Sequence, residues 1–250
     1  DVSGTLRSAQ QARLAPWAGV VHWPQALPDA FHGVVIGNEV LDAVPFKRVH
    51  WDGAVWREQG VAVGADGILV MADIHATVQA PVQGGAAPAW VPGTTTETHP
   101  QAHALVATVA ERLAPGAMAL WIDYGFPEAE YYHPQRTGGT MMCHRAHRVD
   151  ADALCDVGDK DITTHVNFTG VALAAQSAGA DVMGYTSQAR FLLNCGLADL
   201  MQSADLVGKN AAHRLLAEHE MGELFKVMAL GRELSFEPLG FVVGDRTHRL

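Results

Sequence analysis

Short apolar runs recur along the chain and predict the strands of one sheet. Residues 34–36 read Val-Val-Ile between two glycines, which is typical of a strand buried on both faces. Residues 118–122 form a second run of this kind. Four further runs are candidates for strands: residues 20–23, 181–186, 225–230 and 241–243.

Between these runs, apolar positions recur at helical spacing. Several of the segments have a capping residue at the start, such as Ser3 and Asn167, or a glycine at the end. The predicted helices cover residues 3–14, 101–113, 168–178, 187–194, 198–206 and 211–218. Strands that alternate with helices indicate an α/β protein with a mostly parallel sheet and covering helices.

Two segments depart from this alternation. Residues 46–71 contain two hairpin signals, Asp52-Gly53 and Asp66-Gly67, and predict an antiparallel three-stranded meander that covers one side of a site. Its strands are expected at residues 46–51, 55–60 with 61–63, and 68–71. Residues 76–100 are rich in Ala, Gly, Pro and Thr and predict a loop, whereas residues 127–161 have no clean period.

Polar side chains follow the predicted strands at the point where each one ends. Asn38, Glu39 and Asp42 come directly after residues 34–36, and Asp123 and Tyr124 come after residues 118–122. Ligands of open α/β sheets bind beyond the carboxyl ends of the strands, so these residues form a candidate site. A helical turn would place Glu39 and Asp42 on one face. Two more polar residues in loops between elements, Asp161 and His165, join the candidate cluster.

Composition and charge narrow the function classes. The 250 residues carry a net charge of −10, which argues against a nucleic-acid-binding surface and against docking on an anionic membrane. No apolar run is long enough for a transmembrane helix, and no signal peptide opens the chain. Cys143, Cys155 and Cys195 form no CxxC pair and predict reduced thiols in a cytoplasmic protein.

Motifs for several chemistries are missing from the sequence. Its 13 histidines include pairs at short spacing, His99 with His103 and His144 with His147, but no HExxH and no paired cysteine accompanies them. The sequence has no GxSxG elbow, no GxxxxGK[ST] and no GxGxxG. We therefore expect no metal, and a polar site that binds a cationic or hydrogen-bonding substrate beside a cofactor.

The motifs, taken together and in order, resemble a known family. GNEVLDAVP, WREQGV, WIDYGF, Gly139-Thr140, DITTHVNF, TSQARFLL and MGELFKVMAL resemble the MidA family of S-adenosylmethionine-dependent methyltransferases, one member of which methylates protein arginine during assembly of mitochondrial complex I. The resemblance extends from Asp1 to about Val243. Gly4, Met141 and Asn167 depart from the Pro, Leu and Asp of the family pattern, which puts a catalytic role for position 167 in doubt.

The resemblance implies a class I methyltransferase, a Rossmann-like doubly wound sheet with an antiparallel last strand. Residues 34–36 and 118–122 then correspond to the fourth and fifth strands, and residues 181–186 and 225–230 to the sixth and the antiparallel seventh. Residues 1–45 and 101–250 would form the core, including an irregular insertion at 127–166, and residues 46–100 the meander with its wrapping loop. The first strand and the glycine-rich cofactor loop have no counterpart in these 250 residues.

The resemblance also implies roles for the site residues. Asp1 matches the acidic residue that holds the cofactor ribose, and Asn38 and Glu39 are assigned to S-adenosylmethionine with it. Glu39 and Asp42 would hold a guanidinium of a protein substrate, with Asp123 and Tyr124 completing the pocket. His165 is the candidate base.

Two other readings remain open at this stage. One is a catalytically silent partner-binding or assembly module, and the other is a metal-dependent hydrolase that uses the histidines. A parallel sheet without its middle strand exposes unpaired backbone, which is costly. We therefore expect either a longer molecule with an upstream segment or pairing with another chain, for instance in a homodimer. Without that segment the cofactor is expected to bind poorly.

Overall fold

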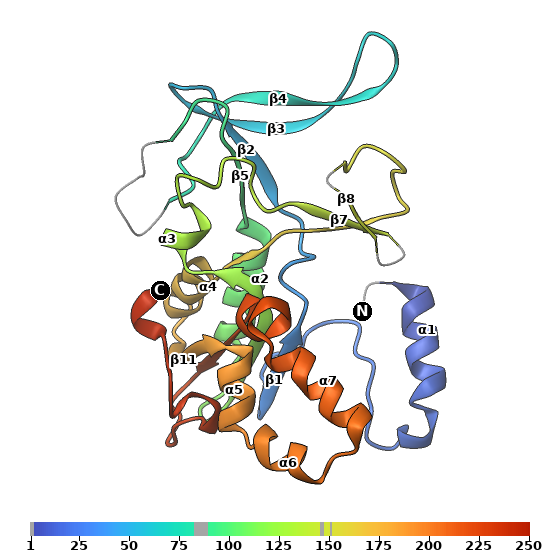
Figure 1. Ribbon diagram of the computed structural model, residues 1–250, viewed down its shortest axis with the longest axis vertical. Coiled ribbons are helices and arrows are strands. Elements are labelled where there is room, and N and C mark those ends of the chain that lie inside the picture. Colours follow the sequence, from blue (N-terminus) through green and yellow to red (C-terminus); the bar gives the residue numbers. More distant parts are fainter. Residues whose placement is uncertain (1–2, 83–89, 146–147, 151) are drawn as a thin grey trace. The chain divides into compact units, whose positions relative to one another are not determined.

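The computed structural model describes the chain except for residues 1–2, 83–89, 146–147 and 151 (Figure 1). It divides into two compact units, Asp1–Ala30 and Phe31–Leu250. The first unit contains α1 (Gly4–Arg13), where Ser3 caps the helix by accepting from Leu6 N, and a 3₁₀ turn at Ala15–Trp17. The strand predicted at residues 20–23 is wrong, because this segment pairs with no strand and remains irregular.

The second unit is built on a mixed sheet with the strand order β1-β6-β12-β11. These strands are β1 (Val34–Asn38), β6 (Met118–Phe126), β12 (Phe225–Gly231) and β11 (Asp181–Ser187). β1 is parallel to β6, as expected, while β12 runs antiparallel to both of its neighbours. A short strand, β10 (Val166–Asn167), pairs in parallel with the end of β6.

The sheet has a helical cover on each face. On one face, α2 (Pro100–Glu111) and α4 (Phe168–Ser177) pack their apolar side chains against Trp121 and Met228. Val227 and Ala229 point to the other face and pack with Phe191 of α5 (Gln188–Asn194) and with Phe241. The alternation along β12 follows the two-residue period of a strand, and this strand, which the sequence predicts, is buried on both faces.

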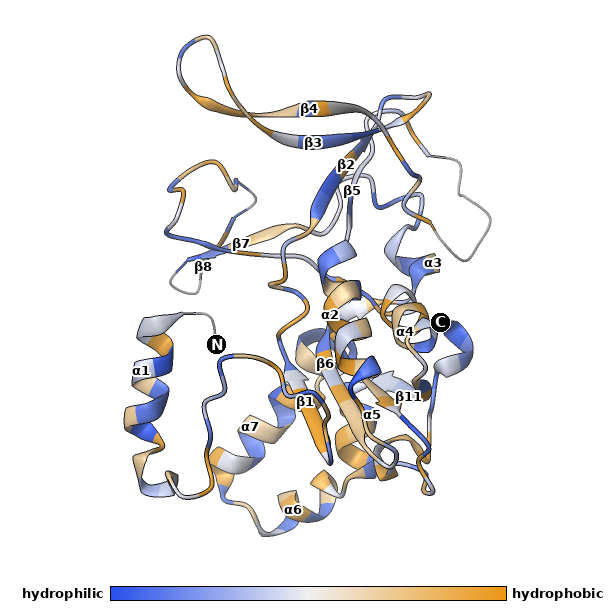
Figure 2. Ribbon diagram, turned by 180° about the vertical axis from the view of Figure 1, so that it is seen from behind, coloured by the Kyte–Doolittle hydropathy of each residue, from blue (hydrophilic) through white to orange (hydrophobic). Residues whose placement is uncertain are grey.

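β1 is less buried than its sequence predicts. Val34 and Ile36 are 57% and 66% exposed, although Val35 between them packs on the core. In the described part of the chain β1 pairs only with β6, so it forms an edge of the sheet. The expectation of burial on both faces is therefore wrong for this strand, and Figure 2 shows it as one of the most hydrophobic elements.

Two other elements differ from the sequence prediction near the C-terminal end. Residues 241–243 do not form a strand; a 3₁₀ turn at Leu239–Phe241 follows Pro238 and places the Phe241 ring against Gly184. α6 (Leu197–Ser203) agrees with the prediction, but α7 (Leu206–Leu216) begins earlier because Asp205 caps it, accepting from Gly208 N at 2.8 Å. A π-helical turn at Glu218–Gly222 and a 3₁₀ turn at Thr247–Arg249 complete this region.

The predicted meander is present and has one strand more than expected. β2 (Lys47–Trp51), β3 (Trp56–Val63) and β4 (Leu69–Val78) are antiparallel neighbours, and β5 (Thr95–Thr98) pairs with the free side of β2. The loop prediction for residues 76–100 is wrong at both ends, because β4 extends to Val78 and β5 occupies Thr95–Thr98. β-branched threonines favour strands, and this signal was outweighed by the Gly and Pro content around them.

Residues 127–161 also contain regular structure that their sequence does not predict. α3 (Glu128–Tyr131) follows β6, and β7 (Met142–Arg145) pairs with β8 (Arg148–Asp150) and β9 (Asp161–Thr163) in a small antiparallel sheet. Strands of three or four residues are too short to show a period in the sequence.

A substitution at Gly125 tests the pairing of β10 with β6. A methyl group there would overlap the carbonyl oxygen of Val166, so Gly125→Ala is expected to lower the free energy of unfolding by about 2 kcal/mol. Nothing lies within 4 Å of the corresponding methyl group at Gly138. The control Gly138→Ala should therefore change the free energy of unfolding by less than about 0.5 kcal/mol. Urea unfolding of both variants is the measurement; equal effects would contradict the pairing.

Candidate functional site

The polar residues at the end of β1 lie beside Asp123 and Tyr124, as the sequence predicts, although β6 does not end at residue 122 but continues through these two residues to Phe126. Asn38 pairs with Ile122 in the sheet, and Glu39 N donates to the Ile122 carbonyl oxygen at 2.9 Å. Asn38 and Glu39 therefore lie beside Ile122 and Asp123, at the carboxyl edge where β1 ends. This edge is where α/β proteins bind ligands.

Asp123 organises the chain that leaves β1. Its carboxylate is buried, and Oδ2 accepts hydrogen bonds from the backbone N–H groups of Leu41 at 3.0 Å and Asp42 at 3.2 Å. Oδ1 accepts from Tyr124 N at 3.0 Å. Burial, and next the charge of Asp42, raise the pKa of Asp123 to about 8 despite these three donors.

The expected helical turn at Glu39 and Asp42 does not form. Glu39 has a φ of +49°, a left-handed conformation that is uncommon outside glycine, and its side chain is exposed. Asp42 is only 4% exposed. The backbone N–H groups of residues 41 and 42 bond to Asp123 instead of forming a helical turn, and the Glu39 side chain is exposed whereas that of Asp42 is buried.

Asp42 has one oxygen in use and one available. Its Oδ2 accepts a hydrogen bond from the Tyr124 hydroxyl, whose pKa is raised by burial and by this bond. Its Oδ1 is buried and has no hydrogen-bond partner among the described residues. A buried carboxylate oxygen without a partner is costly, so it marks a place where a ligand donor would fit.

Asn38 and Glu39, at the end of β1, contact each other. Asn38 Nδ2 donates to Glu39 Oε1 at 3.2 Å, and both side chains are exposed. Asp161 is an exposed residue of β9, a strand that pairs with β7 and not with the main sheet. Asp1 lies outside the described residues.

His165 stands between two aromatic rings of β6. Its ring meets those of Tyr124 and Phe126 edge to face, with centroids 5.3 and 5.1 Å apart. Burial, and then the nearby cations Arg136 and Lys226, lower the pKa of His165 to about 4. The imidazole is therefore neutral at physiological pH, and its buried Nδ1 has no partner in the described part of the chain.

A second buried carboxylate, that of Glu97, holds the backbone next to this site, and the sequence analysis missed it. Glu97 is 0% exposed, and its oxygens accept from Thr140 N at 2.9 Å, Met141 N at 3.3 Å and the Tyr131 hydroxyl at 3.1 Å. Thr140 Oγ1 in turn accepts from His165 N at 3.1 Å. Gly139 has a φ of +74° and packs directly on the Glu97 carboxylate, which accounts for glycine there.

The same network reaches Asp42 through a histidine. His99 Nε2 lies 3.1 Å from Thr164 Oγ1, and Thr164 N donates to the Asp42 carbonyl oxygen at 3.1 Å. Burial and then His103 lower the pKa of His99 to about 3. The only sequence signals for this network were the threonines around Glu97 and the Gly139-Thr140 pair.

Two features of the described residues bear on other functions. No group of three or more His, Cys, Asp or Glu side chains is arranged to hold a metal ion in the part of the chain that the structure covers. No helix among the described residues has the length and hydropathy needed to cross a membrane.

Replacing the charge of Glu97 should loosen the site. Glu97→Gln puts an amide N–H where the carboxylate now accepts backbone donors, and we expect the free energy of unfolding to fall by about 2 kcal/mol. The control Glu58→Gln removes an ion pair at 2.9 Å whose partner Lys47 is exposed, which should cost less than about 1 kcal/mol. Unchanged stability of Glu97→Gln in chemical denaturation would contradict the role given to this network.

The buried His99 and the half-buried His165 should both stay neutral in mildly acidic solution. Their ring NMR signals are expected to be constant from about pH 8 to about pH 5.5, where a free histidine titrates. In the unfolded chain both histidines take up a proton as the pH falls below 6.5. In the folded chain the pKa is about 4 for His165 and about 3 for His99, so the unfolded state binds more protons between pH 6.5 and these values. The free energy of unfolding therefore falls as the pH falls through this range. A titration midpoint near 6.5 for either ring would show that it is not desolvated.

Comparison with known proteins gives a consistent assignment. A family model described as "Putative S-adenosyl-L-methionine-dependent methyltransferase" matches residues 1–186. Among curated proteins, the chain is 25% identical over 229 residues to the mitochondrial protein arginine methyltransferase NDUFAF7 homolog of Caenorhabditis elegans. This alignment covers 84% of the chain and 50% of that protein, so the chain spans about half the length of the relative.

Two crystal structures from Burkholderia thailandensis are similar over the whole chain. An uncharacterised COG1565 superfamily protein is 44% identical with a TM-score of 0.91, and the match covers 100% of this chain and 70% of that one. A second superfamily member, bound to S-adenosyl-homocysteine, is 43% identical with a TM-score of 0.91. The match covers 100% of this chain and 67% of that one. These similarities and the antiparallel β12 between β6 and β11 confirm the expected Rossmann-like methyltransferase fold. The chain belongs to this family of S-adenosylmethionine-dependent methyltransferases, the MidA-like family that its motifs indicate.

Proposed function

We propose that the protein is a methyltransferase that uses S-adenosylmethionine and modifies a nitrogen of a protein side chain, arginine in particular. The observation that carries this proposal is Asp42, a buried carboxylate with an unpartnered Oδ1 at the carboxyl edge of β1 and β6. A carboxylate in that position suits a cationic acceptor. The family supplies the reaction class.

The residues at the end of β1 fit one side of the cofactor. Asn38 and Glu39 are exposed polar side chains bonded only to each other in the described part of the chain, and the left-handed Glu39 is the kind of strained residue that gathers at ligand sites. S-adenosylmethionine, when bound, supplies an electrophilic methyl group on a sulfonium. The superfamily structure with S-adenosyl-homocysteine supports this cofactor, and Asp1 remains a predicted ribose ligand.

The acceptor side of the proposal assigns three roles. Asp42 binds and orients the cationic side chain through Oδ1, and Tyr124 fixes the carboxylate by donating to Oδ2. His165 is neutral, so it can accept a hydrogen bond and then the proton from the acceptor nitrogen, and its lowered pKa makes it a weak base that passes the proton on. Asp123 acts indirectly, by holding the backbone of residues 41 and 42.

Arginine is favoured by its chemistry and by one relative. A planar guanidinium offers five donors in a fixed geometry that matches carboxylate oxygens. The name of the C. elegans relative includes protein arginine methyltransferase. That relative is named as mitochondrial, whereas the cysteines of this chain predict a cytoplasmic protein. A homodimer likewise remains a prediction.

A binding module of the same fold is the second candidate. The observation that favours it is the open edge of β1 with exposed Val34 and Ile36, where a partner strand could add. Titration of the full-length protein with S-adenosylmethionine separates the two candidates, because a silent module gives no binding heat and no transfer.

Loss of the Asp42 charge should abolish turnover. Asp42→Asn keeps the size of the side chain but weakens the charge-assisted bond to the acceptor, and we expect kcat/KM to fall by about 100-fold or more. Asp66→Asn, in a surface turn of the meander, is the matched control and should retain normal activity. The measurement is transfer of a labelled methyl group to an arginine-containing protein by the full-length enzyme; normal turnover of Asp42→Asn would contradict the proposed role.

A further inference from the structure

Three buried polar atoms that have no hydrogen-bond partner among the described residues belong to side chains that contact the neighbouring rings of Tyr124 and Phe126, and we call these three residues a row. They are Asp42 Oδ1, His165 Nδ1 and Arg136 Nε. Native proteins rarely leave such atoms unpaired, and three in succession point to one ligand that would satisfy them. Two of the three already form part of the proposed acceptor site, and Arg136 does not.

Tyr124 and Phe126 connect the members of this row. Asp42 is bonded to Tyr124, the His165 ring contacts both Tyr124 and Phe126, and the Arg136 guanidinium lies over the Phe126 ring with Cζ 4.5 Å from its centroid. Alternate residues of a strand point to the same side, so Tyr124 and Phe126 are roughly 7 Å apart along β6.

The two ends of the row carry opposite charges. Arg136 forms no ion pair with a carboxylate among the described residues. Lys226 is only 5% exposed and lies on the same aromatic ring, with Nζ 5.7 Å from the Phe126 centroid. The Asp42 end is anionic and the Arg136 end is cationic.

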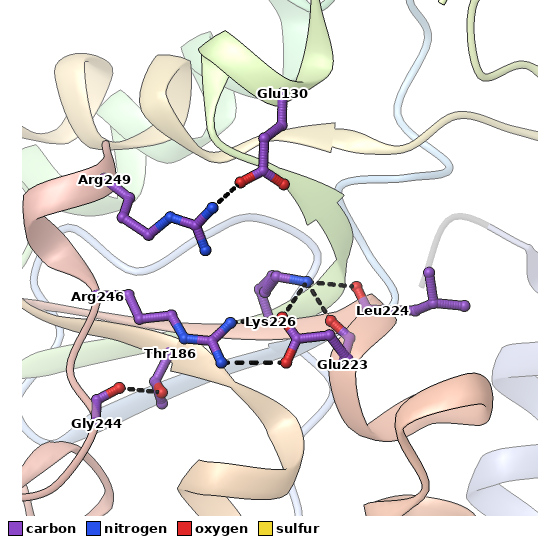
Figure 3. Close-up of polar contacts among 8 residues, drawn as sticks. All are labelled: Glu130, Thr186, Glu223, Leu224, Lys226, Gly244, Arg246 and Arg249. Atoms are coloured by element: carbon purple, nitrogen blue, oxygen red, sulfur yellow. Dashed lines mark hydrogen bonds and ion pairs between the residues drawn. The ribbon is translucent and has the colours of Figure 1, made fainter. Parts of the chain in front are cut away.

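The carboxylates near Lys226 are held mainly by two other cations, Arg246 and Arg249. Figure 3 shows Glu223 between Lys226 and Arg246, whose guanidinium holds both of its oxygens, with Nη2 to Oε2 at 3.2 Å. The Lys226 ammonium donates to the backbone carbonyl oxygens of Glu223 and Leu224, and lies 3.9 Å from the Glu223 carboxylate. Glu130 is engaged by Arg249.

We propose that this row selects an acceptor that carries a carboxylate close to the cationic side chain to be methylated. Arg136 binds that carboxylate and Lys226 adds to the local positive potential, while Asp42 holds the cation at the other end. The inference rests on the proposed function and specifies its substrate class. Asp42 and Arg136 contact the side chains of two residues that are two positions apart on β6, so the carboxylate belongs to a residue near the acceptor, one or two positions away along the peptide, or to the chain terminus.

Peptide affinity tests the inference without relying on turnover. The full-length protein, with S-adenosyl-homocysteine present, is titrated with fluorescent peptides that have one arginine and an Asp, an Asn or a Lys two positions away. A fourth peptide has the arginine next to a free carboxyl terminus and a fifth is its amide, which separates the two sources of carboxylate. We expect the carboxylate peptides to bind about tenfold more tightly than their neutral forms.

Variants then assign the preference to the row. Arg136→Gln and Lys226→Met should remove most of the advantage of the acidic peptide and leave binding of the Asn peptide within about twofold. Arg249→Gln, which breaks an exposed ion pair with Glu130, is the control and should retain the preference. Equal affinity of wild-type protein for Asp and Asn peptides, or an equal loss for both in Arg136→Gln, would overturn the inference. Absence of methyl transfer with the preference intact would contradict the proposed function alone.

Discussion

The described site depends on one buried carboxylate, that of Asp123. By accepting the backbone N–H groups of residues 41, 42 and 124, it ties the segment after β1 to the end of β6. In this arrangement Glu39 adopts a left-handed conformation and the Asp42 side chain lies in the interior. A charge buried beside another charge is normally unfavourable, and the backbone donors together with the raised pKa of Asp123 are what make the pair tolerable.

Glu97 holds the backbone at residues 140 and 141 in the same way that Asp123 holds the backbone at residues 41 and 42. Both side chains use their oxygens on backbone N–H groups, so each holds a loop rather than a ligand. Thr140 and Thr164 carry the constraint from Glu97 and His99 to His165 and Asp42. The groups with unpartnered atoms are therefore attached to a rigid frame, which is what binding with defined geometry requires.

The sequence predicted what depends on local pattern. Residues 34–36 and 118–122 had the composition of adjacent parallel strands, and the polar residues after them fell at one edge because the ends of parallel strands must meet. What it could not predict depends on long-range contacts. Glu97 looks like an ordinary residue of a polar loop, and only its burial under Gly139 and Thr140 makes it structural. The exposure of Val34 and Ile36 and the turn at Glu39 follow from pairing and hydrogen bonds that local periodicity does not encode.

The central claim is that Asp42 Oδ1 is the acceptor-binding atom of this sheet edge. It is tested most directly by a crystal structure of the full-length protein with S-adenosyl-homocysteine and a bound arginine peptide. The account predicts a guanidinium nitrogen within hydrogen-bond distance of Asp42 Oδ1, about 2.7–3.2 Å. A peptide held elsewhere, for instance in the cavity of about 600 Å³ lined by Tyr132, Thr169 and Gln176, with Asp42 Oδ1 bonded only to water or protein, would contradict it.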